Sequence, residues 1–268
     1  AALELAVNLA RKVDADLVIG CDPDADRVGI AVKDQNGDMV LLNGNQTAAL
    51  LVHYILHKHK ENNTLPSNAF IAETVVTTDL IEKIGTSFGV NTKKCLTGFK
   101  WISKIDNLLF GYEEALGYCV DPKVVNDKDG ISAAIIIAQI VGELKEKGIS
   151  LTDYLDKIGE EYGFHLTDQI SIRFTELSKI DNLLAKVLNN PPSEISGHML
   201  EKSENLSDLK AMPSLGIRLI YKDQIRVIIR PSGTEPKLKC YIEVVCESKK
   251  EAVVLLSQIK SALTKVLI

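Results

Sequence analysis

Apolar and polar positions in the first part of the chain predict one helix followed by three strands. The opening stretch ALELAVNLARKVDA has apolar residues at helical spacing. Short apolar runs typical of strands then follow at 16–20, 28–34 and 39–43, with a turn at NGD between the last two. The loop between the first two strands, DPDADR, carries three aspartates at alternate positions.

From about Asn43 the pattern changes to units in which helices and strands alternate. Gly148 directly follows the longest predicted helix, as C-capping favours, and acidic residues lie at the start of that helix. The segment GYEEALG is expected to be a loop between a strand and this helix. Alternation of this kind predicts an α/β layer. The expected helices are 46–60, 79–88, 100–108, 127–148 and 152–161, and the expected strands are 70–76 and 91–96.

The last part of the chain groups its strands before a closing helix, which indicates a small α+β domain. The polar segment 191–210 is expected to be a surface connection. The expected strands are 169–174, 216–221, 225–230 and 237–246, and the expected helices are one that ends near 189 and an amphipathic one at 248–267.

Composition and charge exclude several classes of protein. The 268 residues are 46% hydrophobic, which is enough for a real core and about two domains. With 31 basic and 36 acidic side chains, the chain has no general attraction for nucleic acid or for an anionic membrane. No apolar run is long enough to span a bilayer, and the five cysteines form no close C-x-x-C pair. We therefore expect a soluble cytoplasmic protein with free thiols.

The aspartates of the first loop favour a metal site. Asp22, Asp24 and Asp26 repel one another, so their crowding calls for a cation, and oxygen ligands suit Mg²⁺ or Ca²⁺. An EF-hand loop would need glycine at its sixth position and an acid at its twelfth, where this chain has Arg27 and Lys33. An acidic surface turn is the alternative, but the flanking apolar strands and the adjacent arginine favour the metal loop.

A second candidate site lies in IRPSGTEPKLKCYIE. Between Arg218 and Lys239 there are six basic and two acidic residues, in a chain whose net charge is negative. The turn combines an arginine with hydroxyl and amide donors, which suits a phosphate; its candidate ligands are Arg230, Ser232, Gly233 and Thr234. A plain hairpin turn is the alternative. The serine is not expected to be a hydrolase nucleophile, because no G-x-S-x-G context surrounds it.

Weaker signals lie between these two segments. Glu113 and Glu114 are paired acceptors in a glycine-bounded loop, which suits a ligand rich in hydroxyl groups, although a solvated acidic turn has the same pattern. Lys100 lies beside the only tryptophan in TGFKW. His53 and His57 have i, i+4 spacing, but HKHKEN is typical of the solvated end of a helix, so no metal role is expected there.

Five motifs together carry a specific resemblance. They occur in the order DPDADR (22–27), TGFK (97–100), GYEEALG (111–117), DKDG (127–130) and RPSGTEPK (230–237). In this order and with these separations, the chain resembles the α-D-phosphohexomutase family, which includes the phosphoglucomutases and phosphomannomutases, over essentially its whole length. The resemblance implies an α/β fold in three parts: a remnant of domain II with the metal-binding loop at 1–43, the α/β domain III with the sugar-binding loop at 44–163, and the α+β domain IV with the phosphate-binding loop at 164–268.

The activity that the resemblance implies is that of an Mg²⁺-dependent intramolecular phosphotransferase of the isomerase class, acting in carbohydrate metabolism. A phosphoserine on the first domain passes its phosphoryl group to a hexose phosphate, and a bisphosphate intermediate returns the other one, so that phosphate moves between C1 and C6. Such chemistry needs mainly charge neutralisation and positioning. The implied partners are hexose phosphate and hexose bisphosphate, with no nucleic acid and no membrane.

The resemblance also implies a role for each candidate residue. Lys100 would be an active-site contact that helps proton transfer, and Arg27 would lie near the phosphoserine. The carboxylates of the first loop would bind Mg²⁺, the paired glutamates would hold sugar hydroxyls, and the RPSGTEP loop would hold the phosphate that is not being transferred. The residues concerned are Asp22, Asp24 and Asp26 for the metal, Glu113 and Glu114 for the sugar, and Arg230, Ser232, Gly233 and Thr234 for the phosphate.

The chain departs from the family pattern at three points. No serine loop of the T-A-S-H-N-P type is present, and the chain begins where the second domain should be well under way. We therefore expect a fragment that is inactive alone and whose partner is the missing N-terminal part of the same enzyme. Pro23 replaces a common glycine and Ala115 a common serine. The preferred sugar phosphate stays open, and so do two alternatives: specificity of the phosphopentomutase type, and a non-catalytic module that binds sugar phosphate or metal.

Overall fold

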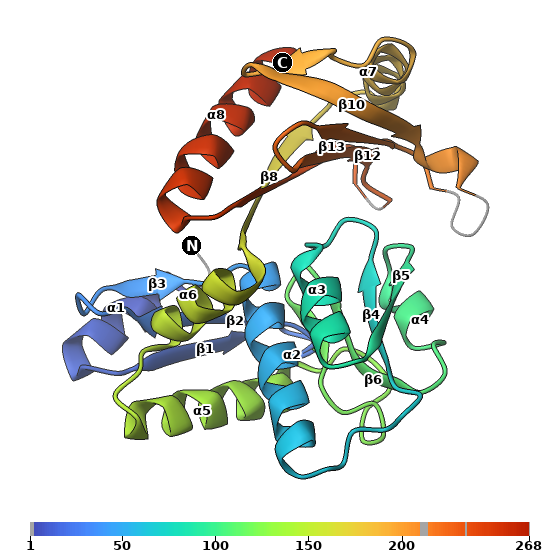
Figure 1. The fold of residues 1–268 in the computed structure, drawn as a ribbon. Helices are drawn as coiled ribbons and strands as arrows, with labels where there is room; N and C mark the ends of the chain where they lie inside the picture. Colours follow the sequence, from blue (N-terminus) through green and yellow to red (C-terminus); the bar gives the residue numbers. More distant parts are fainter. Residues whose placement is uncertain (1–2, 210–213, 234, 268) are drawn as a thin grey trace. The chain divides into compact units, whose positions relative to one another are not determined.

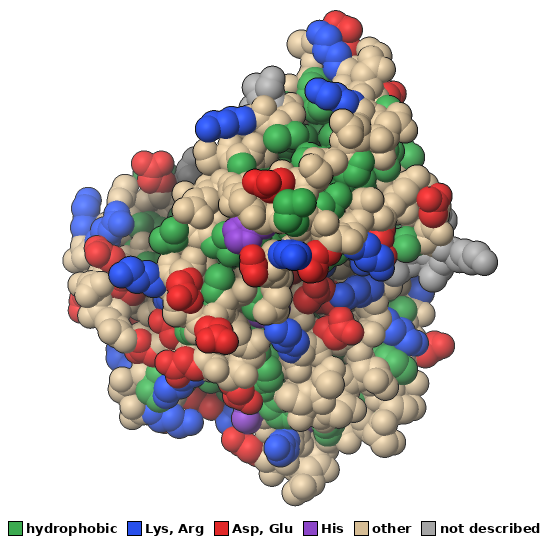
Figure 2. Space-filling model, turned by 45° about the horizontal axis from the view of Figure 1, so that its top comes forward, with side chains coloured by type: hydrophobic (Ala, Val, Ile, Leu, Met, Phe, Trp, Pro, Cys, Tyr) green, Lys and Arg blue, Asp and Glu red, His purple; other side chains and the backbone are tan. Residues whose placement is uncertain are grey.

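The computed structural model describes residues 3–209, 214–233 and 235–267, which form two compact units over 1–162 and 163–268 (Figure 1). Unit 1 contains two sheets and unit 2 contains one, and each unit has its own hydrophobic core. Within the described residues, no helix combines the length and the apolar character that crossing a membrane requires. On the face drawn in Figure 2, basic and acidic side chains are interspersed and do not gather into a patch of one sign.

Unit 1 begins with a helix and a three-stranded antiparallel sheet, as the sequence predicts. The helix α1 (Glu4–Val13) packs its buried side chains against the sheet. The strands β1 (Leu17–Cys21) and β2 (Val28–Lys33) pair with each other, so loop 22–27 joins them as a hairpin connection. The short strand β3 (Met39–Leu41) pairs with the other side of β2.

The larger part of unit 1 is an α/β layer, which confirms the predicted fold class. Its four-stranded sheet has the order β5-β4-β6-β7, in which β4 pairs parallel with β5 and β6, and β7 pairs antiparallel with β6. The carboxyl ends of the three parallel strands therefore meet at one edge, where ligand sites of such sheets commonly lie. The strands are β4 (Phe70–Thr74), β5 (Asn91–Cys95), β6 (Leu108–Glu113) and β7 (Gly117–Cys119), and the helices are α2 (Gly44–Glu61), α3 (Leu80–Ser87), α4 (Phe99–Ile102), α5 (Gly130–Glu146) and α6 (Leu151–Tyr162).

The helix predicted at 100–108 is present but much shorter, and the assignment of all of GYEEALG to a loop is wrong. Helix α4 ends at Ile102, and strand β6 begins at Leu108 and includes the first three residues of that motif. The apolar run before the glutamates is too short to distinguish a strand from a helix by periodicity. Gly111 is needed in the strand because a Cβ at this position would lie 2.5 Å from the Ile102 side chain.

The segment HKHKEN (57–62) is a partly to fully exposed helix end, as the sequence predicts, but His53 lies one turn before it in a different environment. His53 is buried, with 6% of its surface exposed, although His57 one turn later is half-buried. The rings of Tyr154 and Tyr162 on α6 lie edge-on to His53, at centroid distances of 5.3 and 6.2 Å. Helix α6, which is far away in the sequence, therefore covers this turn of α2.

Unit 2 is an antiparallel sheet with helices, as predicted for the α+β part. The sheet has the order β8-β13-β12-β11-β10-β9, and apolar side chains of both helices join its core. The strands are β8 (Phe164–Arg173), β9 (Glu194–Ile195), β10 (His198–Asn205), β11 (Ile217–Tyr221), β12 (Ile225–Pro231) and β13 (Lys237–Cys246); the helices are α7 (Leu177–Asn189), α8 (Lys249–Leu267) and the 3₁₀ turn η1 (Leu206–Asp208).

The predicted surface connection at 191–210 is wrong, because most of this segment forms the edge of the sheet. Strand β10 pairs with β11 and with the short strand β9, and the pairing with β11 is irregular between Leu200 and Lys202. The sequence of β10, HMLEKSEN, is mostly polar, in keeping with side chains that are partly or fully exposed. An exposed edge strand lacks the alternating apolar signal on which strand prediction relies.

Candidate active site

The aspartate loop 22–27 is held at its base by Arg27. The Arg27 amide donates to Asp22 Oδ1 at 3.2 Å, and its Nε donates to Asp22 Oδ2 at 2.7 Å. Ala25 has a φ of 57°, and its amide donates to the Asp22 carbonyl at 2.9 Å. Desolvation acts to raise the pKa of Asp22, but hydrogen bonds and charge from Arg27 outweigh it, so this pKa lies below its usual value.

Asp26 lies close to two cations. Its Oδ2 is 2.7 Å from Lys128 Nζ, and its Oδ1 is 3.5 Å from Arg27 Nε. Oδ1 is buried and makes no hydrogen bond to any residue that the structure describes. Desolvation acts to lower the pKa of Lys128, but Asp26 and the neighbouring carboxylates outweigh it, so the pKa lies above its usual value. Asp24, which lies between Asp22 and Asp26 in the sequence, is exposed.

The chemistry of this loop fits a divalent metal ion. Three carboxylates within one short loop offer hard oxygen ligands. The buried Oδ1 of Asp26 retains an unused capacity to accept, which a cation would fill. The carboxylates of Asp22 and Asp26 face Arg27 and Lys128, so a metal ion would compete with these two cations for the same oxygens.

A second acidic cluster lies beyond the carboxyl end of β4. In the described ranges, the one group of three side chains with ligand atoms all within 4.8 Å of one another is Glu73, Asp79 and Glu82. Lys94 Nζ lies 2.6 Å from Asp79, 3.0 Å from Glu82 and 3.8 Å from Glu73. Lys94 therefore compensates part of the negative charge of this cluster from within the protein.

The paired glutamates lie beside the turn that carries TGFK. Glu113 ends β6 and Glu114 follows it, and both are partly exposed. The Gly98 amide donates to Glu113 Oε1 at 2.7 Å. Gly98 has a φ of 112°, a conformation that side chains with a Cβ rarely adopt. This hydrogen bond brings loops 96–98 and 113–116 together at the edge of the sheet.

Lys100 lies on α4, directly after this turn. Its side chain is exposed, and Nζ is 5.5 Å from the centroid of the Trp101 ring. Trp101 is itself 39% exposed. The lysine is therefore exposed beside the edge of the sheet where Gly98 contacts Glu113.

Loop 113–116 also contacts the beginnings of β2 and α2. The Val28 amide donates to the Leu116 carbonyl at 3.0 Å, which ties the glutamate loop to the end of the aspartate loop. A Cβ at Gly44 would lie 2.0 Å from the Glu114 carbonyl oxygen. Helix α2 can therefore begin against the backbone of the glutamate loop because residue 44 is glycine.

The DKDG motif begins α5 and packs on the aspartate loop. Asp129 is the N-cap residue, and its carboxylate accepts from two amides of the first helical turn at 3.1 and 3.0 Å. The Gly130 amide donates to the Ala25 carbonyl at 2.9 Å, and a Cβ at Gly130 would lie 2.7 Å from the Arg27 carbonyl oxygen. The aspartate loop, the glutamate loop, the TGFK turn and the DKDG motif thus form one site in unit 1.

The RPSGTEP loop lies in unit 2, between β12 and β13. Arg230 Nε is buried and makes no hydrogen bond to the described part of the chain. The Ser232 amide donates to the Lys237 carbonyl at 2.8 Å, which closes the turn. Gly233 is exposed, and Thr234 lies outside the described residues. The arginine therefore offers a donor that an anion would satisfy.

Cations predominate around this loop. Glu235 pairs with Arg173 at 3.0 Å and with Lys237 at 2.9 Å, and the hydrogen bond from Lys237 lowers the pKa of Glu235. Lys239 lies opposite Arg230 in the pairing of β12 with β13. Among the described residues of this loop and its flanking strands, Glu235 thus pairs with two cations, and Arg230 and Lys239 add two more, which leaves positive charge for a phosphate.

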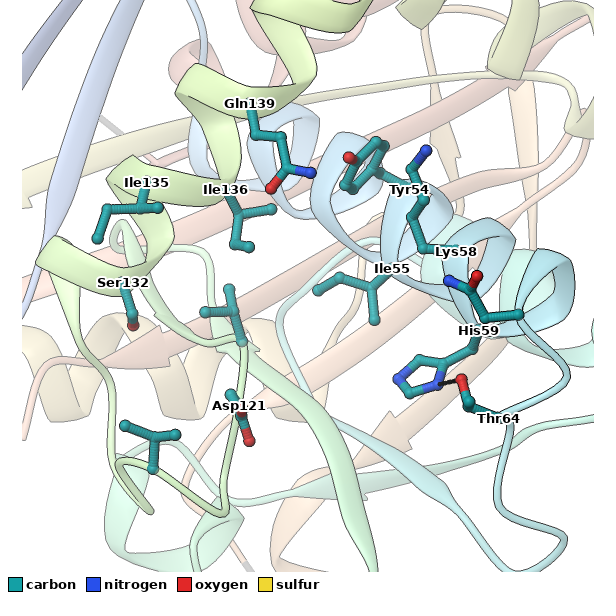
Figure 3. A pocket seen from close by; sticks show the side chains of 13 residues that line it. Tyr54, Ile55, Lys58, His59, Thr64, Asp121, Ser132, Ile135, Ile136 and Gln139 are labelled. Atoms are coloured by element: carbon teal, nitrogen blue, oxygen red, sulfur yellow. Dashed lines mark hydrogen bonds between the residues drawn. The ribbon is translucent and has the colours of Figure 1, made fainter.

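A cavity of about 500 Å³ lies in unit 1 but involves none of the predicted site residues. It lies between α2 and α5, and Figure 3 shows side chains from both helices around it. The His59 imidazole Nδ1 is 2.9 Å from Thr64 Oγ1 at its rim. The labelled lining residues from the two helices are Tyr54, Ile55, Lys58, His59, Ser132, Ile135, Ile136 and Gln139. The predicted site residues therefore do not line this cavity.

Two domain models of one protein family match the chain. The alpha/beta/alpha domain III of phosphoglucomutase/phosphomannomutase matches residues 43–162, and the C-terminal domain of the same proteins matches 194–255. The chain belongs to the phosphoglucomutase/phosphomannomutase family. The matched ranges of this family include the TGFK, GYEEALG, DKDG and RPSGTEP motifs, whereas the aspartate loop 22–27 precedes the first match.

Several curated members of the family are similar to this chain. The probable phosphomannomutase of Haemophilus influenzae is 38% identical over 252 residues, which are 94% of this chain and 50% of that protein. The phosphoglucomutase of Staphylococcus epidermidis is 33% identical over 270 residues, 92% of this chain and 48% of that protein. The chain therefore spans about half the length of the curated relatives it matches.

Solved structures of family members share the fold. The open form of the Paramecium phosphoprotein parafusin, a phosphoglucomutase, has a TM-score of 0.72 at 17% identity over 99% of this chain and 48% of that one. The N-acetylphosphoglucosamine mutase of Aspergillus fumigatus, in complex with GlcNAc-6P and magnesium, has a TM-score of 0.54 at 16% identity over 92% of this chain and 52% of that one. At these identities the comparison shows the fold alone.

Sequence reasoning missed the groups that hold the phosphohexomutase loops together. Lys128 lies within the DKDG motif but was not expected to contact Asp26; its place in a motif beside several acids was the available signal. The Leu116 carbonyl and the close approach at Gly44 involve backbone, and no side-chain pattern indicates them.

Proposed function

We propose that this chain provides the metal-binding, sugar-binding and phosphate-binding parts of an Mg²⁺-dependent phosphohexomutase. In this proposal the enzyme moves a phosphoryl group between C1 and C6 of a hexose phosphate through a bisphosphate intermediate. Residues 1–43 belong to its second domain, 44–163 to its third and 164–268 to its fourth. The five cysteines are free thiols, which supports a reducing cytoplasmic compartment.

The observation that carries the proposal is the backbone contact among three loops of different motifs. The Gly130 amide binds the Ala25 carbonyl, and the Val28 amide binds the Leu116 carbonyl. These contacts fix the aspartate loop next to the paired glutamates. A metal next to a group of sugar-hydroxyl acceptors is what a phosphoryl transfer to or from a sugar hydroxyl requires.

Asp22, Asp24 and Asp26 would hold the magnesium ion. Bound there, the ion would neutralise negative charge on a phosphoryl group and lower the cost of transfer. Arg27 already neutralises Asp22 and would lie beside the phosphoryl group as a second positive charge. The relative from Aspergillus fumigatus was solved with magnesium and a sugar phosphate, which supports this choice of cofactor.

The sugar and its second phosphate would be held by separate segments. Glu113 and Glu114 would accept hydrogen bonds from sugar hydroxyls, and Lys100 would donate to the reacting oxygen or take part in proton transfer. The RPSGTEP loop would hold the phosphate that is not transferred, through Arg230, Ser232, Gly233 and Thr234.

The proposal assigns the phosphoryl carrier to a phosphoserine that these 268 residues do not include, because no T-A-S-H-N-P type loop occurs among them. The chain by itself should bind glucose 1,6-bisphosphate but should not interconvert hexose phosphates. Turnover by the purified chain in a mutase assay would show that the carrier has been wrongly assigned.

Calorimetric titration with glucose 1,6-bisphosphate tests the phosphate site. Arg230→Ala should weaken binding at least tenfold, because a charge-assisted pair is removed. Arg218→Ala is the matched control, since it removes an arginine of the neighbouring strand β11 that pairs with Glu204 at 3.3 Å. Equal affinities in wild type and Arg230→Ala, with the fold unchanged, would refute the assignment.

A non-catalytic module that binds sugar phosphate is the second candidate function. It shares the same three binding segments and differs in needing no phosphoserine. Adding a separately produced serine-bearing segment of a relative distinguishes the two, because only the mutase proposal expects turnover in the mixture. Glucose 6-phosphate, mannose 6-phosphate and ribose 5-phosphate compared as substrates would then decide between hexose and pentose specificity.

A further inference from the structure

Two imidazoles on α2 lie apart from the candidate active site and have no role in the proposed mutase reaction. His53 and His57 are one turn apart, and their ring centroids are 4.4 Å from each other with the planes tilted by 60°. His53 is nine residues beyond Gly44, the start of α2, which corresponds to roughly 13 Å along the helix axis. The pair therefore lies well away from the loops that contact the start of this helix.

The ring of His53 is held in one orientation. Its Nδ1 is 2.6 Å from the Tyr154 hydroxyl of α6. With the proton on Nδ1, the ring donates to the hydroxyl oxygen, and the lone pair is on Nε2. In a histidine that binds a metal through one ring nitrogen, a hydrogen bond from the other nitrogen commonly fixes the tautomer.

The other ring nitrogen of His53 lacks a partner. Nε2 is buried and makes no hydrogen bond within the residues that the structure describes. Burial lowers the pKa of His53 to about 4, with a smaller contribution from His57, so the ring is neutral at pH 7. A neutral imidazole nitrogen without a hydrogen bond is a costly group to bury and is also a metal ligand.

Space and further ligands adjoin the pair. A cavity of about 190 Å³ is lined by both histidines and by Tyr154, Glu61 and Glu143, among others. This volume is large enough for an ion and several water molecules. Glu61 is one turn beyond His57, its side chain is 61% exposed, and its carboxylate lies 3.5 Å from Lys58 Nζ.

We infer that His53 and His57 form a binding site for a borderline divalent transition-metal ion, with Zn²⁺ as the probe. Two imidazole nitrogens would bind the ion, and water or Glu61 would complete its coordination. Imidazole suits zinc, nickel and copper, whereas Mg²⁺ prefers oxygen, so this site and the aspartate loop should select different ions. The inference does not depend on the proposed mutase function.

Calorimetric titration of the whole chain with ZnCl₂ at pH 7.5 tests the site. Excess Mg²⁺ occupies oxygen sites, and a Cys21→Ser background removes the exposed thiol. One Zn²⁺ should bind, and His57→Gln should weaken its binding at least tenfold. His59→Gln is the matched control, because it removes a histidine of the same helix outside the pair and should leave the affinity within twofold of the parent.

His53→Gln should also weaken zinc binding at least tenfold, but it alters a buried packing position. His57→Gln keeps the test decisive if the first variant fails to fold, because His57 is half-buried. A second readout is the zinc-induced rise in Tm, which should occur in His59→Gln and be absent in His57→Gln. Equal zinc affinity in His57→Gln and the parent, or an equal loss in His59→Gln, would overturn the inference.

Discussion

Gly130→Ala should disturb the aspartate loop 22–27 without changing any of its carboxylates. Gly130 is the first residue of α5, and its added Cβ would lie 2.7 Å from the Arg27 carbonyl oxygen and 2.9 Å from the Ala25 carbonyl oxygen. Both contacts are with backbone, so no side chain can turn aside. Either the helix or loop 22–27 must shift.

The expected cost follows from two opposing effects. Alanine is better than glycine inside a helix by about 0.5–1 kcal/mol. Overpacking of a well-filled site costs about 1–3 kcal/mol. The net loss in free energy of unfolding should therefore lie between about 0 and 2.5 kcal/mol, with about 1 kcal/mol as the central value. Gly142→Ala is the control on the same helix, because a Cβ there meets nothing within 4 Å, and it should gain about 0.5–1 kcal/mol.

Urea unfolding followed by tryptophan fluorescence measures this difference, since the only tryptophan, Trp101, lies in unit 1. Mg²⁺ affinity, measured by calorimetry on the same samples, should fall for Gly130→Ala and stay unchanged for Gly142→Ala. If Gly130→Ala matched Gly142→Ala in both stability and Mg²⁺ affinity, the packing of α5 on the aspartate loop would be irrelevant to the metal site.

Two further predictions concern charged groups of unit 1. Lys128→Met should tighten Mg²⁺ binding severalfold, because the lysine no longer competes for Asp26; weaker binding in a calorimetric titration would contradict this. Hydrogen bonds from Tyr54 and Lys58 lower the pKa of Glu143 from 4.5 to about 2, so its stabilising effect is complete above pH 4.5 and is lost as the pH falls toward 2. The difference in free energy of unfolding between wild type and Glu143→Gln, measured by urea titration, should therefore shrink over this range. A difference that stays constant would show that the ionised carboxylate of Glu143 does not stabilise the folded state.

The sequence was most informative where one face of an element is buried or where a motif is contiguous. Strands β11, β12 and β13 alternate or run apolar between clear turns, and their predicted bounds agree with the structure within a residue or two. Strands β6 and β10 were missed for opposite reasons. The first is a short apolar run that periodicity cannot assign, and the second is a polar edge strand.

The candidate site was predictable as a set of residues but not as an arrangement. DPDADR, GYEEALG and DKDG each indicate their own chemistry, whereas the contacts that join them are amide-to-carbonyl bonds at Gly130 and Val28. Backbone contacts of this kind depend on tertiary packing and leave little trace in one sequence. The glycine of DKDG is the exception, because the close approach to loop 22–27 excludes a Cβ.

The central claim is that the aspartate loop and the sugar-binding segments act on one ligand. The most direct test is the affinity for glucose 1,6-bisphosphate, measured calorimetrically at zero and at saturating Mg²⁺ in wild type and in Asp24→Asn. The account predicts that Mg²⁺ strengthens binding to the wild type and that this effect disappears in Asp24→Asn, an exposed position where folding is not at risk. Bisphosphate affinity that is independent of Mg²⁺ in the wild type would contradict it.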